Sequence, residues 1–141
     1  MRVRLAALAL IPLAAGCGGS TPEKSASIPI MTTVAGVAAN NHGFTDVRGA
    51  KSVNVDLHDD YFEPTVVNGR RGQELQAVLE NFGHERHTFT VPREGIDRAL
   101  APGKRATVTI AIPRSGEIGF FCKYHKQLGM AGALAVKKKK S

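Results

Sequence analysis

Hydrophobic and polar residues alternate along the chain beyond about residue 51, and this period of two is typical of half-buried β-strands. No segment in that region shows the hydrophobic stripe of an amphipathic helix. The stretch 93–103 lacks the alternation and is expected to cross between sheets, with room for one helical turn. The pattern predicts an all-β fold of about six to eight strands, arranged as an antiparallel Greek-key sandwich or barrel. The alternating segments cover residues 53–57, 75–79, 87–91, 106–112, 118–122 and 130–136.

The same alternation places two reactive side chains on the core side of their strands. His87 is in phase with Phe89 and Val91, and Cys122 is in phase with Phe120. Neither residue alone indicates a site, because a buried cysteine is commonly just a small hydrophobe. Their combination with other ligand types therefore decides the interpretation.

The N-terminus has the features of an export signal, residues 1–16. Arg2 and Arg4 precede an apolar run that is too short to span a bilayer. The end of that run, Leu-Ala-Ala-Gly-Cys17, resembles the lipobox of bacterial lipoproteins, although its leucine lies one position earlier than usual. The resemblance implies that Cys17 is lipidated and anchors the protein to the extracytoplasmic face of a bacterial membrane. A plain secretory peptide cleaved near Ala15 is the alternative.

Residues 17–50 are interpreted as a lipid-anchored flexible linker. Its first part is small and polar with two prolines, and residues 30–50 are more apolar but have no sustained periodicity. The domain is predicted to occupy residues 51–137, and residues 138–141 form a basic tail.

The formal net charge of +7 suggests nucleic-acid binding until the positions of the cations are considered. Arg2 and Arg4 belong to the predicted signal, and Lys137 to Lys140 lie at the C-terminus; without these six cations the charge is +1. A nearly neutral domain offers no basic face for DNA or RNA. The terminal lysines are interpreted as a solvated end, and attraction to anionic lipid is the alternative.

A metal site is indicated by the loop Cys122-x2-His125-x4-Met130. With Cys17 lipidated, Cys122 is the only thiol of the exported chain and cannot form an internal disulfide. Blue-copper centres combine two histidines and a cysteine with a long axial methionine. The loop supplies three of these four ligands, and His87 is placed on another inward-facing strand to supply the fourth.

With these residues the sequence resembles the cupredoxins, in particular plastocyanin-like or amicyanin-like copper proteins, over about residues 52–137. The resemblance implies one copper ion, Cu(I) or Cu(II), with His87, Cys122 and His125 as equatorial ligands and Met130 as the axial ligand. The binuclear relative needs two cysteines in this loop and is excluded. The motifs that carry the resemblance are Phe62-x-Pro64, Gly72, Asn81-x5-His87 and Phe121-Cys122-x2-His125-x4-Met130.

The resemblance also implies a function and supporting contacts. It implies one-electron transfer through the ring edge of His125, hydrogen bonds near the loop from Asn81 or Thr88, and backbone N–H groups directed to the Cys122 sulfur. Since the protein fills all four coordination positions, no place is left for a substrate, and we expect no enzyme activity.

The ligand choice and the partner are less strongly specified. His84 could replace His87, although His87 begins the alternating strand; His42 and His58 are expected to be solvated. The cations near the predicted site are Lys123, Lys126 and Arg86, and they would favour a redox partner with an acidic docking face. The protein itself is expected to be a monomer. The alternatives are a lipoprotein that stores or delivers copper, a copper enzyme with an open position, and a sandwich without metal.

Overall fold

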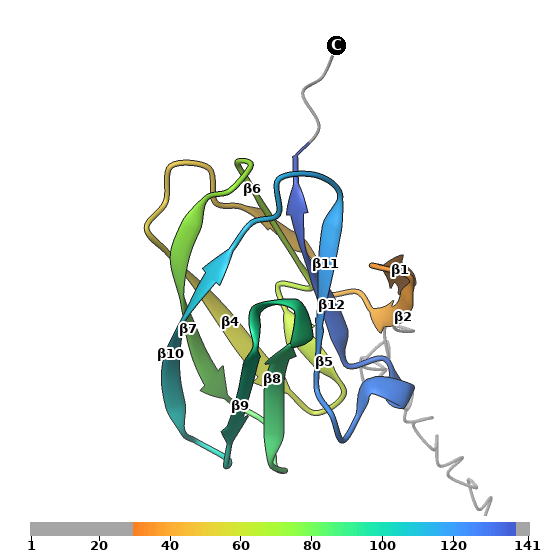
Figure 1. The fold of residues 1–141 in the computed structure, drawn as a ribbon. Helices are drawn as coiled ribbons and strands as arrows, with labels where there is room; N and C mark the ends of the chain where they lie inside the picture. The colour runs from red at the N-terminus through yellow and green to blue at the C-terminus, as the bar shows by residue number, and fades with distance from the viewer. Residues whose placement is uncertain (1–29, 138–141) are drawn as a thin grey trace, which may run out of the picture.

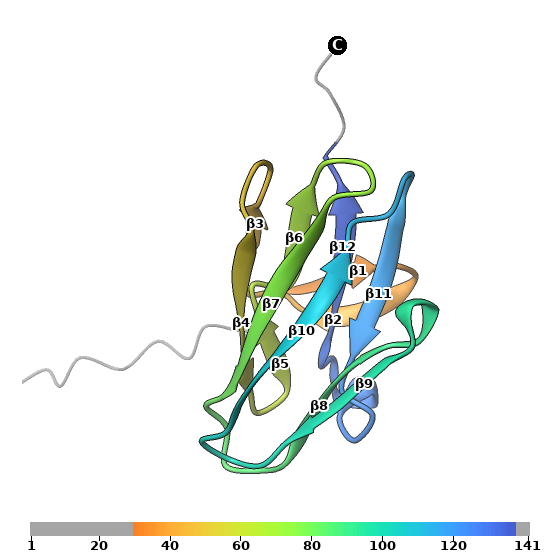
Figure 2. The same ribbon diagram turned by 60° about the vertical axis from the view of Figure 1, so that its left-hand side comes forward.

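Two β-sheets face each other in the computed structural model, which describes residues 30–137 (Figures 1 and 2). One sheet has the order β10-β7-β4-β5, the other has the order β3-β6-β12-β11-β8-β9, and β1 and β2 form a separate hairpin. The predicted all-β sandwich is confirmed. The strands are β1 (Met31–Val34), β2 (Val37–Asn40), β3 (Phe44–Asp46), β4 (Ser52–His58), β5 (Tyr61–Glu63), β6 (Val66–Gly69), β7 (Glu74–Asn81), β8 (His87–Val91), β9 (Ile96–Leu100), β10 (Arg105–Ala111), β11 (Glu117–Phe121) and β12 (Ala131–Val136), with short 3-10 turns η1 (Pro92–Glu94) and η2 (Lys126–Leu128).

The six alternating segments correspond to β4, β7, β8, β10, β11 and β12. The additional strands are short, and strands such as β5 and β6 have too few residues to show a period of two. The stretch 93–103 does contain a helical turn, but most of it is β9, which pairs with β8 in the same sheet. The chain therefore changes sheets only after Leu100.

Not all strand pairs are antiparallel. β4 runs parallel to β7, and β6 runs parallel to both β3 and β12. The antiparallel part of the prediction thus holds for the other pairs, including β7 with β10 and β8 with β11, and it fails for these three, whose crossovers periodicity cannot reveal.

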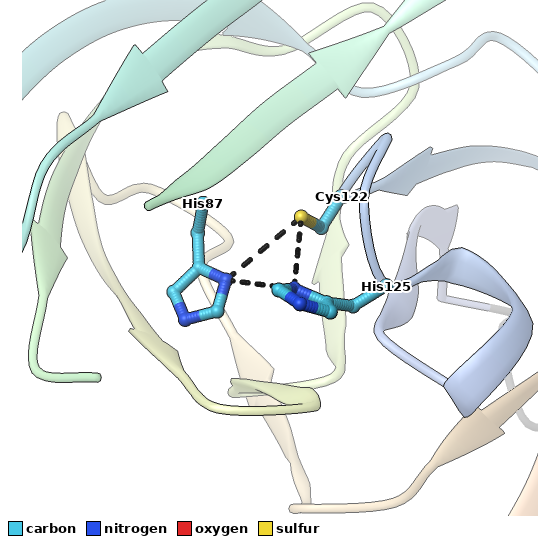
Figure 3. A group of neighbouring side chains, drawn as sticks. All are labelled: His87, Cys122 and His125. Atoms are coloured by element: carbon cyan, nitrogen blue, oxygen red, sulfur yellow. Dashed lines mark hydrogen bonds between the residues drawn. The ribbon is translucent and has the colours of Figure 1, made fainter. Parts of the chain in front are cut away.

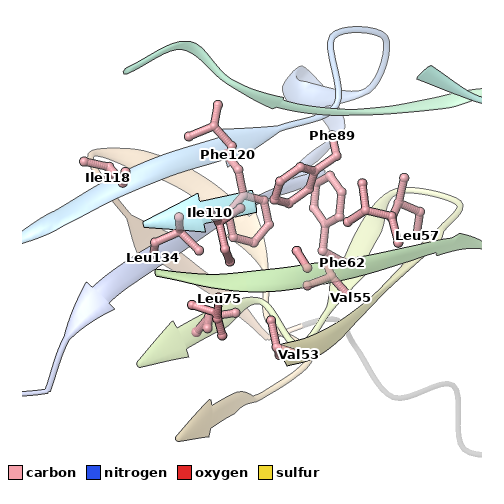
Figure 4. Close-up of a cluster of buried hydrophobic side chains, with 14 of the residues drawn as sticks. Val53, Val55, Leu57, Phe62, Leu75, Phe89, Ile110, Ile118, Phe120 and Leu134 are labelled. Carbon is pink, nitrogen blue, oxygen red and sulfur yellow. The ribbon is translucent and has the colours of Figure 1, made fainter. Parts of the chain in front are cut away.

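Three aromatic rings form the centre of the core between the sheets (Figure 4). Phe62 meets Phe120 edge to face at 5.0 Å between ring centroids, and Phe89 lies 4.9 Å from Phe120. Truncating such a buried ring typically costs about 3–5 kcal/mol. Phe89 lies two residues after His87 and Phe120 two residues before Cys122, so this packing also fixes the strands that carry the candidate ligands.

The prediction that residues 30–50 are a flexible linker is wrong. β1 and β2 form a hairpin beside β12, and β3 extends the larger sheet. Val34 and Ala39 of the hairpin are buried against Ala131 and Ala133, which face away from the main core. The small alanines of β12 leave its outer face apolar and allow another strand to pack closely against it. The hairpin covers this face because burying apolar surface is favourable.

Several predictions concern residues outside the described range. The export signal, the lipidated Cys17 and the basic tail 138–141 all lie there. Within residues 30–137, no helix has the length and apolar character needed to cross a bilayer.

Candidate metal centre

Three of the predicted ligands converge at the lower end of the sandwich as drawn in Figure 1 (Figure 3). The Nδ1 atoms of His87 and His125 are 3.1 Å apart, and the Sγ atom of Cys122 lies 3.9 Å from the first and 3.7 Å from the second. His87 and Cys122 are fully buried, and 15% of the His125 side chain is exposed. The three ligand atoms thus lie close enough to bind one metal ion.

Neighbouring strands bring these residues together. His87 is the first residue of β8, Cys122 follows the last residue of β11, and the two strands pair through Thr90 and Phe121. After Cys122 the chain turns at once, with the Lys126 N–H donating to the Cys122 carbonyl at 2.9 Å. That turn directs the His125 ring back toward the sulfur.

Met130 closes the same loop. The Cys122 N–H donates to the Met130 carbonyl at 3.1 Å, and the Met130 N–H donates to the His125 carbonyl at 3.2 Å. The Met130 side chain is fully buried. All four residues predicted as ligands therefore belong to one end of the molecule.

The donor set fits copper. Each imidazole directs its Nδ1 atom toward Cys122, so two nitrogen donors and a sulfur face one point, which a cation would occupy favourably. Thiolate and thioether suit Cu(I), whereas imidazole suits both oxidation states.

Comparison with protein families agrees with this architecture. The family model of the cupredoxin-like domain matches residues 26–136. The chain belongs to the cupredoxin-like family. The match includes the β1–β2 hairpin, in agreement with the corrected domain boundary.

Solved structures with low sequence identity share the fold of this cupredoxin-like protein. Dithionite-reduced auracyanin from Roseiflexus castenholzii aligns with a TM-score of 0.51 and 16% identity, over 62% of this chain and 98% of its own. The metal-binding domain of the Cu(I)-exporting ATPase CopA of Streptococcus pneumoniae aligns with a TM-score of 0.53 and 9% identity, over 69% of this chain and 98% of its own. The laccase-like multicopper oxidase CueO of Ochrobactrum aligns with a TM-score of 0.53 and 14% identity over 71% of this chain. The alignment spans only 30% of that oxidase. The search of curated proteins gives no match.

Thr88 connects β8, which carries His87, with the loop that carries Cys122 and His125. Its N–H donates to the Cys122 sulfur at 3.5 Å, and its hydroxyl accepts the Lys123 N–H at 2.9 Å. Both contacts fix the cysteine relative to β8. A hydrogen bond to sulfur is one of the features that adjust the electronic properties of a metal–thiolate centre.

Asn81 shapes the segment that leads to His87. Its buried amide donates to the carbonyls of Glu85 and Leu100 at 2.8 and 2.9 Å, and its oxygen accepts the Gly83 N–H. Asn81 thus holds the segment before β8, whereas Thr88 contacts the cysteine directly.

Two carboxylates that the sequence analysis missed lie on the outer nitrogens of the histidines. Asp59 Oδ1 is 2.9 Å from His87 Nε2, and Glu85 Oε2 is 2.8 Å from His125 Nε2. Hydrogen bonds from the side chain and backbone of His84, together with that from His87, hold the pKa of Asp59 well below its usual range. The sequence gives one weak indication of these contacts, because Asp59 directly follows His58 and Glu85 directly follows His84.

The remaining histidines do not join the cluster. His84 is 96% exposed and contacts Asp59 through Nδ1, so the structure brings His87, and not His84, to Cys122. His42 and His58, which are expected to be solvated, are only partly exposed, because their rings stack on Tyr61 with centroids 3.5 and 4.6 Å apart. Burial in this stack is the main cause that lowers the pKa of His42.

Two cations near the cluster have internal contacts. The Nζ atom of Lys123 lies 2.6 Å from Asp97, and that of Lys126 lies 4.3 Å from the centre of the Phe121 ring. Asp97 thus partly neutralises the charge of Lys123, whereas the contact with the Phe121 ring does not neutralise the charge of Lys126.

Proposed function

We propose that this cupredoxin-like protein is a mononuclear type 1 copper protein that transfers single electrons outside the cytoplasm. The observation that carries the proposal is the convergence of His87 Nδ1, His125 Nδ1 and Cys122 Sγ in a largely buried cluster. His87, Cys122 and His125 are the proposed equatorial ligands, and Met130 is the proposed axial ligand.

Bound copper would supply the one-electron chemistry, and the protein would keep its ligands still during the exchange. Packing of Phe89 and Phe120 fixes β8 and β11, and the backbone hydrogen bonds among Cys122, His125 and Met130 fix the loop. A rigid ligand set needs little rearrangement between oxidation states. With four protein ligands no position is free for a substrate, so we propose no enzyme activity.

The proposed electron port is the partly exposed edge of His125. Its neighbours Tyr124 and Leu128 are 57% and 59% exposed, which gives a partner an apolar surface to contact. We further propose a monomer that is anchored through Cys17 to the extracytoplasmic face of a membrane and exchanges electrons with redox proteins. Lys126 and Arg86 would favour an acidic docking face on those partners.

Titration of residues 18–141 with Cu(II) tests the proposal. We expect an intense blue absorption that saturates at one copper per chain and is absent in Cys122→Ser. A pale product, or absorption that survives in Cys122→Ser, would overturn the proposed centre.

Copper storage or delivery is the second candidate function, because the thiolate and thioether donors suit Cu(I). The two candidates differ in kinetics. A reversible couple with rapid self-exchange supports electron transfer, whereas slow exchange together with transfer of Cu(I) to an acceptor supports delivery.

A further inference from the structure

Each imidazole of the cluster has a carboxylate on the nitrogen that points away from Cys122. His87 Nε2 lies 2.9 Å from Asp59, and His125 Nε2 lies 2.8 Å from Glu85. The two acids come from separate parts of the chain: Asp59 from the turn between β4 and β5, and Glu85 from the segment before β8. In Figure 3 the outer nitrogen of His87 is directed away from the other two residues.

These contacts place a proton on the outer nitrogen of each ring. An ionised carboxylate can only accept a hydrogen bond, so the Nε2 atom in each contact must be the donor. A neutral imidazole with its proton on Nε2 has its lone pair on Nδ1. The Nδ1 atoms are those that face Cys122, at 3.9 and 3.7 Å from its sulfur.

Both acids lie on backbone segments that other contacts hold. Asp59 accepts the backbone N–H of His84 at 3.0 Å, and the adjacent carbonyl of Asp60 accepts the Asn40 amide at 2.8 Å. The Glu85 carbonyl accepts the amide of Asn81. The backbone of both acids is therefore held by contacts other than those with the two cluster histidines, and the Asp59 carboxylate itself also accepts the His84 N–H.

We propose that Asp59 and Glu85 are positioning residues of the metal centre, which hold His87 and His125 in the Nδ1-binding form and favour Cu(II) over Cu(I). This inference rests on the proposed copper site. Negative charge close to a metal stabilises its more highly charged state, and outer contacts of this kind also orient the ligands.

The two acids should differ in strength. His87 is fully buried and Asp59 is 39% exposed, whereas His125 is 15% exposed and Glu85 is 66% exposed. Water and salt screen exposed charges more than buried ones. The effect of Asp59 is therefore the larger.

Affinities for both oxidation states test the proposal in Asp59→Asn and Glu85→Gln, with Asp60→Asn as the matched control. Asp60 is the next residue of the same turn, and its φ of 71° is a conformation that asparagine tolerates. The control thus removes the same charge one residue further along. Competition with chelators gives the Cu(II) and Cu(I) dissociation constants of the purified protein and its variants.

We expect Asp59→Asn to weaken Cu(II) binding about 10–100-fold and Cu(I) binding less. If the Cu(II) affinity falls tenfold relative to the Cu(I) affinity, the reduction potential rises by about 59 mV. Glu85→Gln should shift the ratio in the same direction by a smaller factor, and Asp60→Asn should leave it unchanged. Equal ratios in Asp59→Asn, Glu85→Gln and Asp60→Asn would overturn the proposal.

Nitrogen-15 NMR of the copper-free protein provides a readout that does not depend on copper. We expect a proton on the Nε2 atoms of His87 and His125; an unprotonated Nε2 on either ring would contradict the assigned contact. Failure of the wild-type protein to form a blue copper complex would instead overturn the proposed function. The two failures are therefore distinguishable.

Discussion

The side chain of Asn40 occupies the space beside Gly129 that any larger residue would need. A Cβ atom built on Gly129 would lie 2.9 Å from the amide group of Asn40, and the Asn40 N–H donates to the Gly129 carbonyl at the same distance. The Asn40 amide also donates to the carbonyls of Leu128 and Asp60, at 2.9 and 2.8 Å. The N-terminal hairpin thereby holds the end of the ligand loop immediately before Met130.

Replacing Asn40 by alanine should destabilise the fold and loosen the loop. The change leaves the carbonyls of Leu128 and Asp60 without their donor, at a cost of about 1–3 kcal/mol in the free energy of unfolding. Urea denaturation measures this cost. Asn54→Ala, at an exposed position of β4, is the control and should stay within about 0.5 kcal/mol of wild type. Equal stability of the two variants would show that the Asn40 contacts contribute nothing.

Gly129→Ala should be costly for two separable reasons. Gly129 has φ of 95°, where a side chain strains the backbone by about 1–3 kcal/mol, and the new methyl group would meet Asn40. Gly103→Ala carries the first cost alone, because its φ is 74° and no atom lies within 4 Å of the added Cβ. We expect Gly129→Ala to be the less stable variant. Combining it with Asn40→Ala should cost less than the sum of the two, since the smaller side chain removes the clash; strict additivity would contradict the contact.

Long strands of this fold can be predicted from the sequence, whereas short ones cannot. Long strands with one buried face, such as β4 and β7, were predicted because their alternation extends over several residues. β1 and β2 were missed because four-residue strands show little periodicity, and their burial depends on Ala131 and Ala133 far along the chain. No local pattern reports such a distant surface.

The candidate site likewise has residues that the sequence could predict and residues that it could not. Cys122, His125 and Met130 could be predicted because they lie in one loop, and the phase of β8 indicated His87. Asp59 reaches His87 only because β4 and β7 run side by side in parallel, which places the turn after β4 next to the segment before β8. That juxtaposition is tertiary and leaves no spacing in the sequence.

Thr88→Val should separate the backbone contact of Thr88 from the contacts of its hydroxyl. The variant keeps the shape of the side chain and the hydrogen bond from the backbone N–H to the Cys122 sulfur. It removes the hydrogen bond between the hydroxyls of Thr88 and Thr90 and the acceptor of the Lys123 N–H. Leaving that donor unsatisfied should cost about 1–3 kcal/mol of stability. Thr107→Val, on the exposed face of β10, is the control. Chemical denaturation compares them, and a Thr88→Val variant as stable as the control would rule out a structural role for the hydroxyl.

Replacing each neighbouring histidine by alanine should identify the ligand. His84→Ala should still bind one copper with the blue absorption, because the exposed His84 ring contacts Asp59 and lies outside the cluster. His87→Ala should lose the absorption, because it removes one of the two nitrogens that face Cys122. Visible spectra during copper titration measure both. Loss of the blue band in His84→Ala with its retention in His87→Ala would reverse the assignment.

Met130→Leu should change the reduction potential far more than the fold. The two side chains have similar volumes, and such exchanges in a core usually cost less than about 1.5 kcal/mol of stability. Met130 is fully buried and its backbone hydrogen bonds do not involve the side chain, so the loop should keep its shape. A thioether suits Cu(I), but the axial bond is long and weak, so the larger effect should be the replacement of a polarisable group by an apolar one, which disfavours the more highly charged Cu(II) more than Cu(I). Voltammetry should therefore show a higher potential than in the wild-type protein, with the blue absorption retained. An unchanged potential in a stably folded variant would exclude Met130 as an axial ligand and leave the three-residue cluster of His87, Cys122 and His125 as the whole centre.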